Sequence, residues 1–192
     1  MKIAVFASGN GSNFQALVDY FKKNRLSATI EWLFCDQPHA YVLQRAKKAQ
    51  VPSTCFSPKE FASKTEYEQA ILEELANREI DLIVLAGYMR IVGEGLLSTY
   101  ENKMINIHPS LLPNFPGLHG IRDAFEAGVK ETGVTVHYID RGVDTGPIIR
   151  QEKVMIEKED TLATLEQKIH QIEHQIFPEV IANIVNMGDV KK

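Results

Sequence analysis

The segment "IAVFASGNGSNF", residues 3–14, joins an uninterrupted apolar run to a cluster of turn-forming residues. Residues 3–7 are all apolar, as expected of a strand that is buried on both of its faces. Residues 13–23 then carry apolar side chains at helical spacing, three and four positions apart. The segment therefore predicts a buried strand, a turn and a helix, which is the first unit of a sheet covered by helices.

The same alternation of strands and helices continues through the first half of the chain. Apolar and β-branched runs predict strands at residues 29–35, 52–56 and 81–87. Helical spacing of apolar residues predicts helices at residues 41–49 and 64–78. This order of elements indicates an α/β fold with a parallel sheet and helices on both of its faces.

The second half of the chain follows a different pattern. Strands are predicted at residues 103–109, 133–140 and 148–156, and too little sequence separates the last two for a crossover helix. We therefore expect antiparallel pairing near one edge of a mixed sheet. A long helix follows, and Pro178 is expected to kink or restart it. No repeat or linker interrupts the sequence, so a single domain over residues 1–192 is expected.

The composition is that of an ordinary globular domain. The chain has 192 residues, of which 44% are apolar and 24% charged, which is enough to bury its own core. A net charge of −4 with both signs interspersed argues against nucleic-acid and membrane partners. The sequence contains neither a signal-peptide pattern nor an apolar run of about 20 residues, the length of a membrane span. Because Cys35 and Cys55 are isolated, we expect free thiols and a cytoplasmic protein.

Four polar segments are expected to meet at one edge of the sheet. They are "SGNGSN" (8–13), "GYMRIVG" (87–93), "NIHPS" (106–110) and "DRGVDTGP" (140–147), and each follows a predicted strand. Ligands of open parallel sheets bind beyond the carboxyl ends of the strands. The convergence of these segments predicts a functional site at that edge.

The first of these segments favours an anion. Its glycines permit close backbone approach, and the free amides of a helix N-terminus attract a phosphate. One alternative is a plain turn with Ser12 or Asn13 as the helix cap. Another is a dinucleotide site in which Asp36 binds a ribose, but Phe14 stands where the third glycine of that motif belongs. A monophosphate site is the favoured interpretation.

Asn106 and His108 lie two residues apart on a predicted strand, so their side chains point to the same face. Asp144 lies in a glycine-rich loop that can fold back toward them, and a neighbouring carboxylate favours the charged form of an imidazole. A cation beside an amide donor suits an oxyanion that forms on a carbonyl carbon. The sequence has no motif for a nucleophilic Ser or Cys and no metal-ligand spacing. Direct attack of a substrate amine on an acyl donor is therefore the expected chemistry.

The other histidines carry weaker predictions. His137 is expected to be structural or to contact the site residues from behind. His119 could line the site or merely cap it, and both interpretations stay open. His170 and His174 fall on the long helix, where a solvated face is expected.

Together "SGNGSN", "LAGYMRI", "INIHPSLLPNFPGLHG" and "GVTVHYIDRGVDTGPII" resemble the phosphoribosylglycinamide formyltransferases, folate-dependent enzymes of purine biosynthesis. The resemblance spans nearly the whole chain. It implies one Rossmann-like domain around a mostly parallel seven-stranded sheet, with a nucleotide- and phosphate-binding half (1–100) and a catalytic and folate-binding half (101–192). It also implies formyl transfer from 10-formyltetrahydrofolate to the amine of glycinamide ribonucleotide, without a metal, in a monomer or weak homodimer.

The resemblance also implies roles for individual residues. The positions that match catalytic residues of the family are Asn106, His108 and Asp144. The positions that match its substrate contacts are Gly11, Ser12, Asn13 and Glu173. The positions that match its folate contacts are Lys64, Met89, Arg90, Ile91, Val92, Asn106 and Asp140, with Leu85 and Leu97 as apolar walls. Lys64 stands where some relatives have Arg and His170 where some have Gln, so ligand contacts at these two positions stay open.

Other functions compete with this interpretation. Methionyl-tRNA formyltransferase, formyltetrahydrofolate hydrolase and the sugar-nucleotide formyltransferases share the chemistry, whereas a nicotinamide-binding module and a non-catalytic nucleotide-binding protein do not. A further hypothesis is that residues 116–128 form a mobile lid, because Gly117, Gly120 and Gly128 could act as its hinges.

Overall fold

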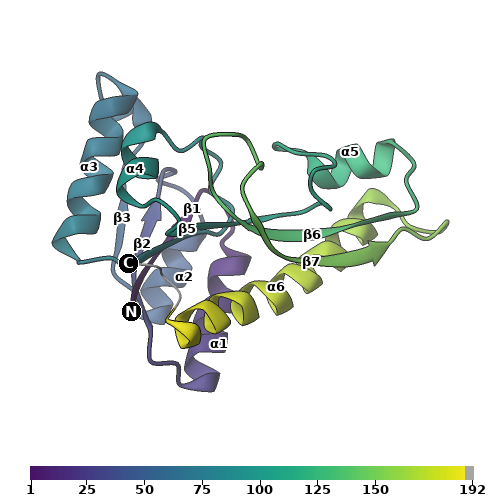
Figure 1. Cartoon of the computed structure of the whole chain (residues 1–192), viewed down its shortest axis with the longest axis horizontal. Coiled ribbons are helices and arrows are strands. Elements are labelled where there is room, and N and C mark those ends of the chain that lie inside the picture. Colours follow the sequence, from purple (N-terminus) through teal and green to yellow (C-terminus); the bar gives the residue numbers. More distant parts are fainter. Residues whose placement is uncertain (189–192) are drawn as a thin grey trace.

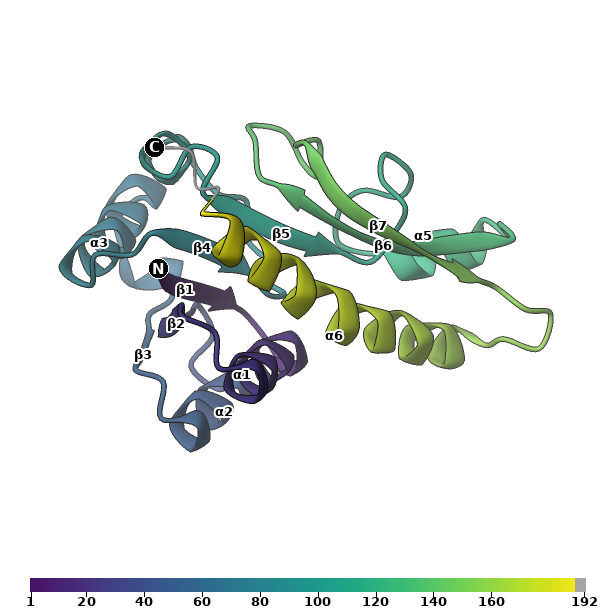
Figure 2. The same ribbon diagram turned by 60° about the horizontal axis from the view of Figure 1, so that its bottom comes forward.

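The computed structural model describes residues 1–188 and contains one seven-stranded sheet (Figures 1 and 2). Its strand order is β3-β2-β1-β4-β5-β6-β7. The strands are β1 (Lys2–Ala7), β2 (Thr29–Cys35), β3 (Ser53–Cys55), β4 (Leu82–Leu85), β5 (Met104–His108), β6 (Glu131–Tyr138) and β7 (Ile148–Met155). The helices are α1 (Ser12–Asn24), α2 (Val42–Ala49), η1 (Pro58–Glu60), α3 (Lys64–Asn77), α4 (Glu94–Thr99), α5 (Gly120–Glu126) and α6 (Leu162–Met187). Residues 189–192 of the expected domain lie outside the described part of the chain.

The pairing of the strands confirms the predicted mixed sheet. Strands β1 to β5 pair in parallel, whereas β5 with β6 and β6 with β7 pair antiparallel. Because β1 lies between β2 and β4, the chain reverses its direction of winding between β1 and β4. Ligands of such sheets bind at the reversal, where the loops that follow the two strands diverge to opposite faces.

Helices cover both faces of the sheet, as predicted from the alternation of elements (Figure 2). On one face, apolar residues of α1, α2 and α6 pack on alternate residues of β1, including Ile3 and Val5. On the other face, α3 and α4 pack on Ala4 and Phe6 of the same strand. All four side chains are almost completely buried. A strand that is buried on both faces needs apolar residues at every position, which explains the apolar run that opens the chain.

The turn between β1 and α1 requires a glycine at residue 11. Gly11 has a φ of 75°, in the left-handed region that side chains rarely adopt. A Cβ atom at this position would also lie 2.3 Å from Cγ2 of Val42 in α2. Gly11 therefore sets both the direction in which α1 leaves the sheet and its close packing against α2.

Pro178 was expected to kink or restart the helix, and of these two outcomes the restart does not occur. Helix α6 runs through Pro178 as one continuous element (Figure 2). A proline inside a helix removes one backbone hydrogen bond. Its neighbours Ile176, Phe177 and Ile181 are nearly or fully buried against the sheet, and burial of such side chains stabilises the fold by about 1.5–3 kcal/mol each. This burial outweighs the lost hydrogen bond and keeps the helix intact.

Two further expectations concern cysteines and membranes. Cys35 and Cys55 are both free thiols, as predicted. Within residues 1–188, none of the helices has the length and apolar character that crossing a membrane requires.

Gly11→Ala is expected to lower the free energy of unfolding by about 1–3 kcal/mol, because the added methyl group overpacks against Val42. Gly9→Ala is the matched control, since a Cβ at residue 9 would meet no atom within 4 Å. The control is expected to change stability by no more than about 0.5 kcal/mol. Urea unfolding of both variants measures the difference, and equal stabilities would contradict the packing role of Gly11.

Candidate active site

The loops that follow β1, β4 and β5 meet at one edge of the sheet, as predicted. The loop after β6 begins at the other end of β5, because the two strands are antiparallel, and it folds back until Asp144 faces His108. The loop after β1 is bonded directly to the loop after β4. The Ser8 N–H donates to the Gly87 carbonyl at 2.9 Å, and the Met89 N–H donates to Oγ of Ser8 at 2.9 Å. These bonds place the glycine-rich turn beside residues 89–92, which were expected to bind folate.

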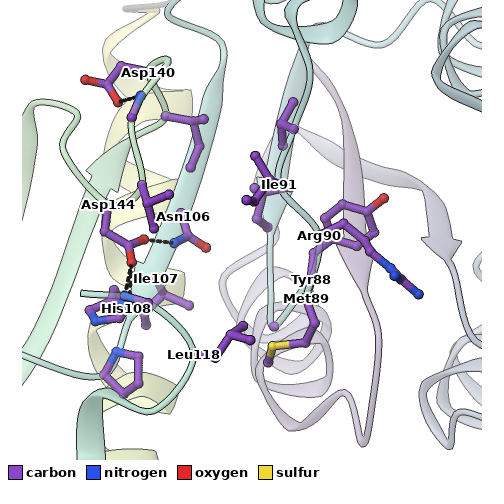
Figure 3. Close-up of a pocket in the computed structure, with 18 residues that line it drawn as sticks. Tyr88, Met89, Arg90, Ile91, Asn106, Ile107, His108, Leu118, Asp140 and Asp144 are labelled. Atoms are coloured by element: carbon purple, nitrogen blue, oxygen red, sulfur yellow. Dashed lines mark hydrogen bonds and ion pairs between the residues drawn. The ribbon is translucent and has the colours of Figure 1, made fainter. Parts of the chain in front are cut away.

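A cavity of about 380 Å³ opens between two walls at this edge (Figure 3). The first wall is the loop after β4, residues 88–92, together with Leu85. The second wall is formed by the end of β5 and by the loop after β6, with side chains that include Asn106, His108, Asp140 and Asp144. Leu118, whose side chain is exposed, lines the cavity as well. The volume falls within the range of about 300–1,000 Å³ that is usual for small-molecule sites.

The structure brings the three predicted catalytic residues together in this cavity (Figure 3). Nδ1 of His108 lies 3.4 Å from Oδ2 of Asp144, and Nδ2 of Asn106 donates to Oδ1 of Asp144 at 3.5 Å. Asp144 is held in place by the Gly117 N–H, which donates to Oδ2 at 2.8 Å. The amide, the imidazole and the carboxylate therefore share one small volume, and Gly117 of the proposed lid is tied to it.

Both ring nitrogens of His108 face hydrogen-bond acceptors. Nε2 lies 2.8 Å from the carbonyl oxygen of Phe115 and must donate to it, because a carbonyl only accepts. Nδ1 faces the Asp144 carboxylate at a distance longer than a strong hydrogen bond. The Phe115 carbonyl thus fixes the orientation of the ring, and Nδ1 is the nitrogen on the side of Asp144.

The pKa of Asp144 lies below its usual value of 3.8. Burial of this side chain alone would raise its pKa. Hydrogen bonding from His137 and from the Gly117 N–H, together with the nearby charge of His108, outweighs burial and lowers the pKa. The carboxylate is therefore ionised throughout the neutral range and presents a negative charge to His108.

His137 contacts the site from the neighbouring strand, which agrees with one of the roles expected for it. It pairs with Asn106 across β5 and β6, and its Nε2 lies 3.2 Å from Nδ2 of Asn106 and 3.6 Å from Oδ1 of Asp144. Its Nδ1 donates to the carbonyl of Tyr138 at 2.8 Å. His137 is completely buried, so it supports the site from below without lining the cavity.

Thr135 is a supporting residue that the sequence did not single out. It pairs with His108 across the same two strands. Its hydroxyl donates to the Ser110 carbonyl at 2.6 Å and accepts from the Leu112 N–H at 3.1 Å. It therefore fixes the turn that leads from His108 to Phe115. The alternation of Val134, Thr135 and Val136 was the available signal, because a buried threonine among valines indicates a polar partner.

The predicted substrate contacts form a second group at the N-terminus of α1. No side chain caps this helix, so the alternative of a plain turn capped by Ser12 or Asn13 is wrong. Its first amides are left without a side-chain partner, as an anion site requires. Nδ2 of Asn13 donates to Oε2 of Glu173 at 3.2 Å, although 160 residues separate them in the sequence. The structure thus joins the glycine-rich turn to the carboxylate that the resemblance assigned to the same substrate.

The expectation of a solvated face for His170 and His174 holds only in part. His170 is exposed, but its Nδ1 lies 2.8 Å from Oε2 of Glu173. Nε2 of His174 is buried and makes no hydrogen bond with the described residues. His170 therefore contacts the substrate group through Glu173, and the ring of His174 stacks on that of His170.

Asp36 is not available for the role that a dinucleotide site would give it. Its side chain is completely buried, and Oδ2 accepts from Nε of Arg90 at 2.6 Å. The guanidinium of Arg90 points away from the cavity (Figure 3). The backbone of residue 90 therefore lines the cavity while its side chain anchors the loop to the end of β2.

Two other charged contacts hold the walls of the cavity. Oε1 of the buried Glu68 accepts from the Gly93 N–H at 2.7 Å, which secures the end of the first wall. Arg141 and Glu94 form two hydrogen bonds, of 3.0 and 2.6 Å, that link the loop after β6 to the start of α4. Because both Arg141 and Glu94 are exposed, this ion pair contributes little to the stability of the fold.

Three residues are not brought to the cavity. Nζ of Lys64 lies 3.7 Å from Oε1 of Glu68, and its side chain is mostly exposed. Leu97 packs on the apolar cluster under α3 and α4 and does not form a wall. His119 occupies the position before α5 without a capping hydrogen bond, and it does not line the cavity.

A sequence model described as formyl transferase matches residues 1–181. The chain belongs to the formyl transferase family. Phosphoribosylglycinamide formyltransferase of Bacillus subtilis is 51% identical over 188 residues, which cover 98% of this chain and 96% of that protein. These findings confirm the resemblance that the sequence motifs indicated.

Solved structures of the family share the fold as well. Glycinamide ribonucleotide transformylase 1 from Geobacillus kaustophilus is 53% identical with a TM-score of 0.94, covering 96% of this chain and 98% of its own. Phosphoribosylglycinamide formyltransferase from Bacillus halodurans is 46% identical with a TM-score of 0.95, covering 98% of this chain and 97% of its own. The seven-stranded mixed sheet is therefore the fold of this family.

The donor set at this edge of the sheet has no arrangement typical of a metal site. In the part of the chain that the structure describes, no three His, Cys, Asp or Glu side chains gather in a way that could hold a metal ion.

The pKa of Asp144 predicts how its contribution to stability changes with pH. A carboxylate whose pKa is lowered by folding stabilises the protein above its unfolded pKa of about 3.9, and this contribution disappears as the pH falls through the lower folded pKa. The difference in unfolding free energy between the wild type and Asp144→Asn should therefore shrink between pH 5 and pH 3. Asn suits this test because residue 144 has a φ of 55°, which Asn tolerates. Urea unfolding measures the difference, and a constant value over this range would contradict the lowered pKa.

Proposed function

We propose that this chain transfers the formyl group of 10-formyltetrahydrofolate to the amine of glycinamide ribonucleotide. The products are formylglycinamide ribonucleotide and tetrahydrofolate, in the synthesis of purines. The observation that carries the proposal is the meeting of Asn106, His108 and Asp144 in one cavity beside an uncapped helix N-terminus. The names of the B. subtilis relative and of the similar solved structures support the same activity.

The folate co-substrate would bind in the 380 Å³ cavity. Its pterin ring would lie between Leu85 and the loop of Met89, Arg90, Ile91 and Val92 on one side and Asp140 and Asn106 on the other. Met89 and Ile91 are exposed although they are apolar, as expected of residues that the face of a flat heterocycle covers. Lys64 lies outside the cavity, so a contact with the distal part of the folate is the only one that it could make.

The nucleotide substrate would bind at the start of α1. The backbone amides of Gly11, Ser12 and Asn13 would hold its phosphate, because they lie at the positive end of the helix dipole. Glu173 would accept hydrogen bonds from the ribose hydroxyls. We thus assign phosphate binding mainly to residues 1–100 and catalysis to residues 101–192, with one wall of the folate cavity from each half.

The reaction would proceed through a tetrahedral intermediate. The substrate amine attacks the formyl carbon and forms a new C–N bond, and the electron pair of the C=O bond moves onto the oxygen. The Asn106 amide and Nδ1–H of His108 donate to this oxyanion, while Asp144 stabilises the charge on the imidazole. A proton then passes from the attacking nitrogen to the folate nitrogen, and the bond between that nitrogen and the formyl carbon breaks.

The structure gives specific reasons to prefer this function to a nicotinamide site. Phe14 is completely buried where a dinucleotide motif needs a glycine. The carboxylate of Asp36, which would bind the ribose, is already hydrogen-bonded to Arg90. We further propose that the protein acts in the cytoplasm as a monomer or weak homodimer, without nucleic-acid, membrane or metal partners.

Formyl transfer to glycinamide ribonucleotide, followed at the folate chromophore, tests this function directly. The expected result is turnover that requires both substrates. Loss of the formyl group without an acceptor would instead indicate a hydrolase. Transfer to methionyl-tRNA or to an amino sugar nucleotide would indicate the corresponding rival within the family, and a thermal shift with nicotinamide dinucleotide alone would indicate the other class.

His108→Ala and Asp144→Asn are each expected to lower kcat about 10²- to 10³-fold, because each removes or weakens a donor to the oxyanion. His39→Ala is the matched control, since this exposed histidine lies in the loop between β2 and α2. The control should retain its turnover within a factor of two or so. Circular dichroism and urea unfolding verify that the variants fold, and near-native turnover in either folded variant would remove that residue from the mechanism.

A further inference from the structure

Glu173 has a hydrogen-bonding arrangement that leaves one of its oxygens for a ligand. Its side chain is only 6% exposed. Oε2 accepts from Nδ2 of Asn13 at 3.2 Å and lies 2.8 Å from Nδ1 of His170. Oε1 makes no hydrogen bond with the residues that the structure describes. Because a buried carboxylate is costly unless it is paired, His170 is the cation that compensates its charge.

His170 is suited to this pairing by its position on α6. It precedes Glu173 by three residues, so the two side chains lie on the same face of the helix. The hydrogen bond with Glu173 raises the pKa of His170 above its usual 6.5 and outweighs burial, which lowers it. The charges of Glu173 and Glu166 add to the increase in pKa. Around neutral pH, the ring is therefore charged to a greater extent than a free histidine.

His174 behaves in the opposite way. Its ring stacks on that of His170, with centroids 6.4 Å apart and an interplanar angle of 13°. Burial lowers the pKa of His174, the charge of Glu173 opposes this, and the charges of His170 and of Arg45 in α2 lower it further. From α1, the neutral amide of Asn13 completes the group. Burial first, and the charge of His170 after it, therefore disfavour the charged form of His174, whereas the contact with Glu173 favours the charged form of His170.

We propose that His170 is a positioning residue that sets the affinity for the substrate by holding Glu173. Its charged ring fixes Oε2, so that Oε1 stays oriented to accept from vicinal hydroxyls such as those of a ribose phosphate. This inference rests on the proposed function and adds to it a residue that determines the affinity for the nucleotide.

The direction of the effect follows from the chemistry of the ring. Below its pKa, His170 carries a positive charge and pairs with the carboxylate. As the pH rises through that pKa, the ring keeps one donor but loses its charge, and the contact weakens. Because the ring is about half exposed, solvent screens the interaction, and a change of roughly three- to tenfold in KM for the nucleotide is expected. Since His170 contacts no reacting atom, kcat at saturating substrate should not change.

The kinetic test compares wild type and His170→Gln from pH 6 to pH 9. The substrate amine and phosphate titrate in this range too, but they affect both proteins equally. The informative quantity is therefore the KM of His170→Gln for glycinamide ribonucleotide divided by the KM of the wild type. The ratio should be roughly three to ten at pH 6 and should fall toward one at pH 9, with kcat unchanged. The control is His39→Gln, which replaces an exposed histidine and should give a ratio of one at every pH. A ratio of one for His170→Gln at every pH would overturn the proposal, and a lowered kcat with unchanged KM would do so too.

A second measurement is independent of turnover. The pKa of His170, followed by NMR of its ring in the unliganded protein, should lie above 6.5 in the wild type and fall in Glu173→Gln. An unchanged pKa in the folded variant would overturn the pairing. If the wild type fails to turn over glycinamide ribonucleotide at all, the proposed function fails, and the NMR titration still decides whether His170 holds Glu173.

Discussion

The antiparallel pairing of β5 with β6 is the constraint on which the site depends. It places His137 opposite Asn106 and Thr135 opposite His108, so each polar residue of β5 has a polar partner beside it. On the other side, β4 pairs with β5 only as far as Asn106, and the strand continues past the end of its parallel neighbour. The two isoleucines of β5 anchor it in the core of one face. The polar side chains therefore face a cavity at the open end of the other face.

Most of the fold could be predicted from local patterns in the sequence. The bounds of β2 agree with the prediction, and α3 differs from it by one residue, because burial of alternate strand residues and of one helix face leaves a direct record in the sequence. The antiparallel edge followed from the short connection before β7. The continuity of α6 through Pro178 could not be predicted in this way, since it depends on packing against strands that are remote in the sequence.

The site was predictable where strand alternation or the resemblance applied. Alternation placed Asn106 and His108 on one face, and the loop of Asp144 folds back to them as expected. The contacts that fix these side chains were not predictable, because they involve backbone groups and distant side chains. The carbonyl of Phe115 orients His108, and Arg90 bonds to Asp36 although 54 residues separate them. A resemblance also cannot place a substituted residue, and Lys64 lies beside Glu68 instead of the cavity.

The most direct test of the account is a crystal structure of the protein with glycinamide ribonucleotide and a folate analogue that cannot transfer its formyl-like group. The substrate amine should lie about 3–3.5 Å from the carbon that stands for the formyl carbon. The oxygen on that carbon should face Nδ2 of Asn106 and Nδ1 of His108. A folate bound outside the cavity, or an oxygen turned away from both donors, would contradict the account.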